Sequence, residues 1–138
     1  MDAEERSKLL RESRYCVVAY GRKSGPPAMS PVYYVMDGDD LLISTKAGRA
    51  KGRVFAEERE VSVCVLSEAP HPSPPYITIY GRGRIEREGA VDLMMRVGEV
   101  MRGEPVPESA RPAVEERAQK EERVVLRITP ERYVGRDG

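Results

Sequence analysis

The chain has 138 residues, 40% of them apolar and 33% charged, and its 23 basic residues balance its 23 acidic residues. Globular domains cluster near about 100–150 residues, so this length predicts a single domain over residues 1–138. The balanced charge argues against a nucleic-acid partner, because dedicated DNA and RNA binders usually carry a basic excess. No apolar run approaches the about 18 residues that suggest a membrane span, and no signal peptide or lipidation motif is apparent. We therefore expect a soluble, cytoplasmic protein that does not contact a membrane.

The first half of the chain alternates strand patterns with turns that contain glycine or proline. In chain order, the pattern predicts a helix over 2–13, a strand over 15–20, a turn over 21–27, a strand over 28–36, a hairpin turn over 37–40, a strand over 41–45, a helix over 49–58 and a strand over 61–66. Pro31 indicates an edge position or a bulge in the second strand.

The second half begins with a proline-rich loop, which contains the only histidine of the chain, His71. In chain order, the pattern predicts a loop over 67–75, a strand over 76–86, a helix over 90–101, a connector over 103–112, a helix over 113–122, a strand over 124–129 and an irregular tail over 130–138. Gly81 and Gly83 suggest a bulge or a close backbone approach. Five or six strands with hairpin connections and one inserted helix predict an α+β fold, mainly antiparallel β, of the barrel type.

Few residues of this sequence suit acid–base, nucleophilic or metal chemistry. No set of Cys, His and carboxylate residues has the spacing of metal ligands, so we expect no metal site. Nothing in the sequence brings His71 to a nucleophile, and the catalytic residues remain unassigned. Cys16 and Cys64 lie in apolar strand segments, where we interpret them as reduced, buried side chains. Without such a cluster, the sequence favours chemistry that a bound cofactor carries.

Residues 41–66 carry the most informative charge pattern of the chain. Four cations surround the glycine turn and the first part of the predicted helix: Lys46, Arg49, Lys51 and Arg53. Three acids lie at the predicted end of that helix: Glu57, Glu58 and Glu60. The helix macrodipole favours the opposite order by about 0.3–1 kcal/mol per exposed charge. Cations at the positive end of the helix therefore predict a bound anion.

The predicted anion is a phosphate. Helix N-termini offer unpaired N–H groups to a phosphate, and Ser44 and Thr45 add two hydroxyl donors. The alternative is a solvated basic face on which Arg53 and Glu57 pair at i, i+4. On an ideal helix Arg49 and Lys51 differ by about 200° around the axis. They can reach one phosphate only if the helix begins near Arg49 and the two side chains wrap its open end.

Three segments resemble the split β-barrel flavin and deazaflavin oxidoreductases, the relatives of pyridoxamine 5′-phosphate oxidase. They are SPVYY at 30–34, STKAGRAK at 44–51 and PERYVG at 130–135. The resemblance extends over roughly residues 8–135 and is greatest to the branch that uses the deazaflavin coenzyme F-420. It implies an FMN-binding type of split barrel and a homodimer that holds the cofactor in a groove between its subunits.

The resemblance also implies the residues of the cofactor site. Arg49 and Lys51 would bind the cofactor phosphate, with Ser44 and Thr45 as hydroxyl contacts and Arg53 as a further cation. Three residues match the strand that runs along the ring system of the cofactor: Ser30, Pro31 and Val32.

Three functions remain open at this point. The first is an oxidoreductase that uses F-420 to transfer hydride to or from a small conjugated organic substrate. The second keeps the fold but uses FMN, as in pyridoxamine 5′-phosphate oxidase-like proteins and flavin reductases. The third is a carrier or sensor that binds a cofactor or a haem-like ligand without turnover, with His71 as an axial ligand. The sequence does not identify the acceptor substrate.

Overall fold

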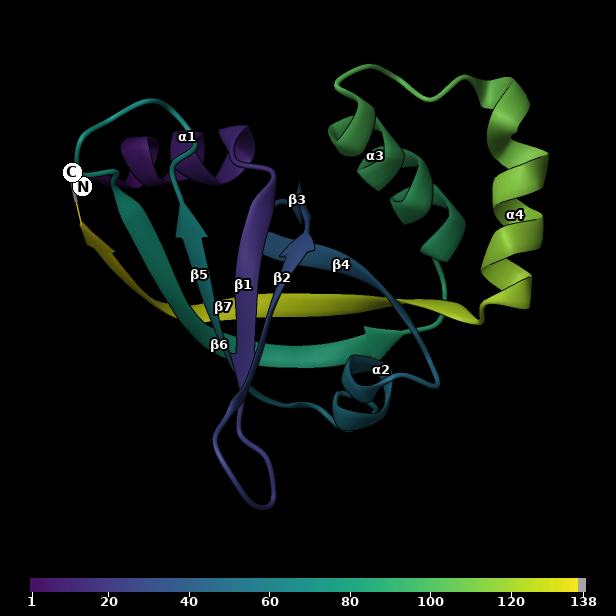
Figure 1. Ribbon diagram of the computed structural model, residues 1–138, viewed down its shortest axis with the longest axis horizontal. Coiled ribbons are helices and arrows are strands. Elements are labelled where there is room, and N and C mark those ends of the chain that lie inside the picture. The colour runs from purple at the N-terminus through teal and green to yellow at the C-terminus, as the bar shows by residue number, and fades with distance from the viewer. Residues whose placement is uncertain (137–138) are drawn as a thin grey trace.

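The fold is built on one seven-stranded sheet, and every pair of neighbouring strands in it is antiparallel. The structure is a computed structural model and describes residues 1–136. Its strands are β1 (Tyr15–Tyr20), β2 (Ala28–Tyr33), β3 (Val35–Asp37), β4 (Asp40–Lys46), β5 (Arg59–Leu66), β6 (Tyr76–Glu86) and β7 (Arg123–Arg136). Their order is β2-β1-β5-β6-β7-β4-β3, and the sheet curls into a half-open barrel (Figure 1). The α+β split-barrel prediction is confirmed.

The helices lie around the barrel. They are α1 (Ala3–Glu12), α2 (Ala50–Val54), α3 (Ala90–Arg102) and α4 (Arg111–Lys120), with a 3-10 turn η1 (Glu108–Ala110) before α4. Figure 1 shows α1 across one end of the sheet, α2 close to the far end of β4, and α3 beside α4. Asp2 caps α1 by accepting a hydrogen bond of 2.8 Å from the Glu5 amide. Among the described residues, no helix is long and apolar enough to cross a membrane.

The core occupies the inner face of the curled sheet. Strand residues alternate between the two faces, so every second side chain of β1 and β5 enters the core. The largest side chains that are almost fully buried are Tyr34, Phe55, Leu41, Ile43, Ile77, Ile79, Leu126 and Ile128. Cys16 is also buried there, and Cys64 is half-buried on the next strand; both are free thiols. Burial raises the pKa of the Cys16 thiol to about 12.

The predicted strand over 28–36 is divided in two at Tyr34. Its phenol ring is 2% exposed, its hydroxyl donates to the Leu10 carbonyl, and its amide donates to the Arg14 carbonyl. These contacts turn the chain away from β1, so β2 pairs with β1 whereas β3 pairs with β4. Because β2 lies at one edge of the sheet, Pro31 is on an edge strand, which is one of the two positions that the sequence predicted for it.

The predicted irregular tail over 130–138 was wrong for residues 130–136, which continue β7; residues 137–138 lie outside the described part of the chain. A register shift at Tyr80–Gly81 places Pro130 at a bulge, where the missing N–H of proline is tolerated. A Cβ atom at Gly81 would lie 2.2 Å from the Thr129 carbonyl oxygen, so the expected close approach of backbones occurs there.

Candidate functional site

A hollow of about 350 Å³ lies where the end of β4, the start of α2 and the start of β7 meet. Its lining residues are Ser44, Thr45, Lys46, Arg49, Ala50, Lys51 and Arg123. Four of these seven residues are cations and none is acidic. We call this space the basic hollow. Its charge alone makes it suited to an anion rather than to a neutral or cationic ligand.

The position of α2 allows two cations at its N-terminal end, Arg49 and Lys51, to enter the basic hollow. The helix begins at Ala50 with Arg49 as the N-cap residue, so the geometric condition for convergence of Arg49 and Lys51 is met. Gly52 lets α2 approach the end of β4, since a Cβ atom there would lie 2.3 Å from the Lys46 carbonyl oxygen. The helix has only five residues, and the side chains rather than its N-terminus therefore dominate the charge of the hollow.

Three cations of the basic hollow lack an acidic partner within the described chain. Lys46, Arg49 and Lys51 take part in none of the ion pairs formed among residues 1–136. Arg123 is the exception, because its Nε donates to Glu121 at 2.7 Å. That hydrogen bond holds the pKa of the Glu121 carboxyl below its usual value. A bound anion would therefore meet three positive side chains that form no ion pair within residues 1–136.

The predicted helix over 49–58 was too long, and the acids assigned to its end lie elsewhere. The helix ends at Val54 because Phe55 turns into the core, where its side chain is fully buried. The Phe55 carbonyl accepts a hydrogen bond from the Ile85 amide at 3.0 Å. Glu58 lies beyond the helix and pairs with Arg82 at 3.2 Å. The cations remain clustered although the predicted distribution of charge along one helix was wrong.

Arg53 does not line the basic hollow. Its guanidinium donates to the Gly48 carbonyl at 2.6 Å and so braces the turn that precedes α2. No ion pair between Arg53 and Glu57 is present among the described residues, so the solvated i, i+4 pair does not form. Arg53 therefore acts on the shape of the loop, whereas Arg49 and Lys51 reach the hollow itself.

Ser44 has the most unusual environment of the hydroxyl groups at this site. Its Oγ atom is buried and, within the part of the chain that the structure describes, has no hydrogen-bond partner. Leaving such a group unpaired costs about 1–3 kcal/mol. Ser44 lines the basic hollow and also a larger cavity beside it. Its orphaned hydroxyl can donate a hydrogen bond to a ligand bound where the two spaces adjoin.

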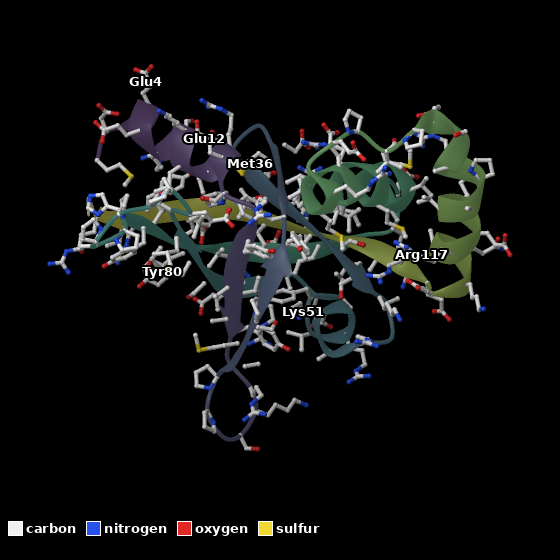
Figure 2. All side chains as sticks on the ribbon, turned by 45° about the horizontal axis from the view of Figure 1, so that its top comes forward. Glu4, Glu12, Met36, Lys51, Tyr80 and Arg117 are labelled. Atoms are coloured by element: carbon white, nitrogen blue, oxygen red, sulfur yellow. The ribbon has the colours of Figure 1, made fainter. Side chains whose placement is uncertain are left out.

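The larger cavity has a volume of about 680 Å³ and lies between β2, β4, α3 and α4. We call it the helical cavity. Its volume is within the roughly 300–1,000 Å³ typical of small-molecule sites. Ser44 and Arg123 line both spaces, so the helical cavity and the basic hollow adjoin. Figure 2 labels Lys51 on α2 and Arg117 on α4, which belong to the two different spaces.

The three residues predicted to follow the cofactor ring lie on β2. Val32 lines the helical cavity, whereas Ser30 and Pro31 line neither space. They sit opposite Val18 and Val17 of β1. Because β2 ends the sheet order, one side of its backbone has no neighbouring strand within the described chain. That edge offers N–H and C=O groups to a ligand.

Sequence reasoning did not identify Arg123 as a site residue. It enters the basic hollow because β4 and β7 pair in a register that places Lys46 opposite Arg123. The sequence contains no signal for this pairing, since β4 and β7 lie far apart along the chain. The individual residues of the α4 side could not be predicted, because residues 103–122 contain no motif that distinguishes them.

The family described as "Pyridoxamine 5'-phosphate oxidase" matches residues 3–136. No match was found among curated proteins. A conserved hypothetical protein of Mycobacterium tuberculosis, Rv2991, is similar in structure with a TM-score of 0.83 and 22% identity, covering 99% of this chain and 85% of that one.

Two further solved structures are similar at lower TM-scores. An F420 reductase has a TM-score of 0.70 and 20% identity, covering 93% of this chain and 94% of its own. An FAD binding protein from Mycobacterium smegmatis has a TM-score of 0.65 and 18% identity, covering 99% of this chain and 96% of its own. At these identities the structural likeness establishes the fold, and the match of the family over nearly the whole chain establishes the family.

Proposed function

This chain belongs to the pyridoxamine 5′-phosphate oxidase family, and on that premise we propose that it is an oxidoreductase that uses the deazaflavin coenzyme F-420. The proposed reaction transfers hydride to or from a small conjugated organic substrate. The observation that carries the proposal is the basic hollow, where Lys46, Arg49 and Lys51 have no acidic partner in the described chain. The orphaned Ser44 hydroxyl beside them adds a donor of the kind that a phosphate requires.

The proposed roles of the residues follow from their positions. Arg49 and Lys51 bind the cofactor phosphate through charge-assisted hydrogen bonds, and Ser44 and Thr45 add hydroxyl donors. Arg53 supports the same site indirectly through its bond to the Gly48 carbonyl. The backbone edge of β2, over Ser30, Pro31 and Val32, orients the ring system.

When bound, the deazaflavin supplies the hydride chemistry, which no side chain of the site provides. The protein contributes position and electrostatics: the cations hold the anionic end, and the apolar wall of the helical cavity limits access of water to the other end. The proton that accompanies hydride transfer to a double bond comes from solvent, so no side chain is assigned as proton donor.

FMN is the second candidate cofactor. The family name and the FAD binding protein among similar structures favour a flavin, and a flavin phosphate satisfies the basic hollow as well as a deazaflavin phosphate does. The phosphate contacts would be the same in both cases. The two candidates therefore differ in the ring and the group that receives the hydride rather than in the anion site.

We further propose that the working unit is a homodimer. Five large apolar side chains remain exposed on the outer face of β2, β1, β5, β6 and β7: Met29, Tyr15, Leu66, Tyr80 and Val134. Tyr15, Leu66 and Tyr80 alternate with buried residues along their strands and so point away from the core. Met29 and Val134 pair with Ala19 and Thr78, which lie on the same outer face. An apolar sheet face of this kind is typical of a protein–protein interface. We propose that a second copy of the chain covers this face.

Spectroscopy and turnover test the proposed function together. The purified chain is titrated with F-420 and, separately, with FMN, and quenching of cofactor fluorescence measures binding. Oxidation of reduced F-420 is then followed with a panel of enone, quinone and tetrapyrrole acceptors. We expect F-420 to bind and at least one enone or quinone to be reduced. Tight FMN binding without F-420 binding would move the assignment to the flavin, and binding without turnover would indicate a carrier.

A further inference from the structure

The wall of the helical cavity that faces away from β4 is made by two helices with different chemistry. On α3, Met94, Val97 and Met101 follow helical spacing and present one apolar face. Met101 is 56% exposed at this wall and so is accessible to a ligand in the cavity. Methionine side chains adapt to ligands of varied shape. The α3 side is therefore suited to an apolar body.

The α4 side of the helical cavity supplies charge. Val114 and Arg117 lie at helical spacing on one face of α4, and Glu121 is the C-cap residue that follows the helix. Including Arg102 and Arg123, the lining holds three arginines and one glutamate, so its charge is net positive. Glu121 is already engaged by Arg123 at 2.7 Å. The positive excess therefore rests mainly with Arg102 and Arg117.

These two arginines have weak competing partners. Arg117 is 3.9 Å from Glu121, and its side chain is 59% exposed. Arg102 pairs with Glu104 at 3.0 Å, but Glu104 does not line the cavity. Exposed pairs of this kind contribute about 0–1 kcal/mol, so an incoming carboxylate can replace them at little cost.

Building on the proposed function, we propose that the helical cavity is the substrate site and that it selects an apolar organic acid. The apolar body of the substrate packs against Met94, Val97 and Met101, and its carboxylate lies toward Arg117 and Arg102. The cofactor phosphate occupies the basic hollow, and the two ligands meet beside Ser44 and Arg123, which line both spaces. A neutral or cationic analogue of the same length lacks the charge that the α4 side recognises.

A single introduced tryptophan makes the test direct, because the chain contains none. Met101→Trp places one indole at an exposed position of the cavity wall. Three ten-carbon probes are titrated against it without cofactor: decanoate, decanol and decyltrimethylammonium. We expect saturable binding of decanoate, with decanol and the cation at least about tenfold weaker, the equivalent of one charged contact. Equal binding of decanol and decanoate would overturn the proposed selection for an acid.

Arg117→Gln, made in the Met101→Trp background, tests the charged side of the cavity. Lys120→Gln removes a positive charge from the same helix outside the cavity and is the matched control. We expect Arg117→Gln to weaken decanoate binding by about fivefold or more and Lys120→Gln to change it by less than about twofold. Circular dichroism confirms that both variants fold. Equal affinities in the two variants would contradict a role for Arg117.

Titration of decanoate with and without bound F-420 distinguishes a failure of this inference from a failure of the proposed function. With F-420 at saturation, we expect decanoate to bind with an affinity within about threefold of its value without cofactor. Complete displacement of decanoate by F-420 would overturn the substrate assignment, because the cavity would then belong to the cofactor. Failure of the proposed function looks different: neither F-420 nor FMN binds, while decanoate binding and its dependence on Arg117 persist.

Discussion

Lys51 extends into the basic hollow without an acidic partner in the described chain, so its ammonium group is available to a ligand. Lys51→Ala should weaken cofactor affinity by about 1.5–3 kcal/mol, the value of one charged hydrogen bond. Titration of F-420, or of FMN if that cofactor binds, measures the loss by fluorescence. Lys120→Ala, outside the hollow, is the matched control and should leave the affinity unchanged. A Lys51→Ala protein with wild-type affinity would remove Lys51 from the site.

Ser44 leads to two expectations of opposite sign. In the protein without cofactor, Ser44→Ala removes a buried hydroxyl that has no partner, so the free energy of unfolding should stay level or rise by about 1 kcal/mol. The same variant should weaken cofactor binding by about 0.5–1.5 kcal/mol, because a hydrogen bond to the ligand is lost. Thermal unfolding and cofactor titration measure the two effects. A clear loss of stability without cofactor would show that the hydroxyl has a partner inside the protein.

At the scale of the element, the approach of α2 to β4 fixes the shape of the basic hollow. Gly52→Ala should destabilise the fold by about 1–3 kcal/mol, since the added Cβ atom meets the Lys46 and Ala47 carbonyl oxygens at 2.3 and 2.6 Å. This cost exceeds the about 0.5–1 kcal/mol that alanine gains over glycine within a helix. Urea unfolding compares the variants. Gly48→Ala is the control, because nothing lies within 4 Å of its added Cβ atom; equal midpoints would contradict the packing account.

Local patterns predicted the existence of most helices and strands but not where two of them end. The helix predicted over 49–58 stops at Val54 because Phe55 packs edge-on against Tyr20, with ring centroids 5.4 Å apart. Helix propensity contains no information about that distant contact. Strand β7 continues past Pro130 because the bulge opposite Tyr80–Gly81 accepts a proline. Both outcomes depend on partner strands that the local sequence does not specify.

The same limit separates the predicted from the unpredicted part of the site. Ser44, Thr45, Arg49 and Lys51 belong to one short segment, so their charge and spacing could be read directly. Arg123 joins them only through the pairing of β4 with β7. The helical cavity likewise depends on tertiary packing, because its walls come from β2, β4, α3 and α4. No motif in residues 103–122 predicted the α4 part of that wall.

At the scale of the whole molecule, the apolar outer face of the sheet predicts the oligomeric state. Wild-type protein should have twice the mass of one chain in light scattering, since Leu66 and Tyr80 are 53% and 42% exposed in the single chain. Leu66→Glu places a charge on that face, at the end of β5, and should yield a folded monomer. Lys120→Glu is the control away from the face and should stay dimeric. A monomeric wild-type protein would contradict the proposed interface.

A crystal structure of the chain grown with F-420 tests the central claim most directly. We predict that the cofactor phosphate occupies the basic hollow, within hydrogen-bond distance of Lys51 Nζ and the Arg49 guanidinium, with Ser44 Oγ as a further donor. The deazaflavin ring should then lie along β2. A complex in which the phosphate binds elsewhere, while the hollow contains only water, would contradict the account.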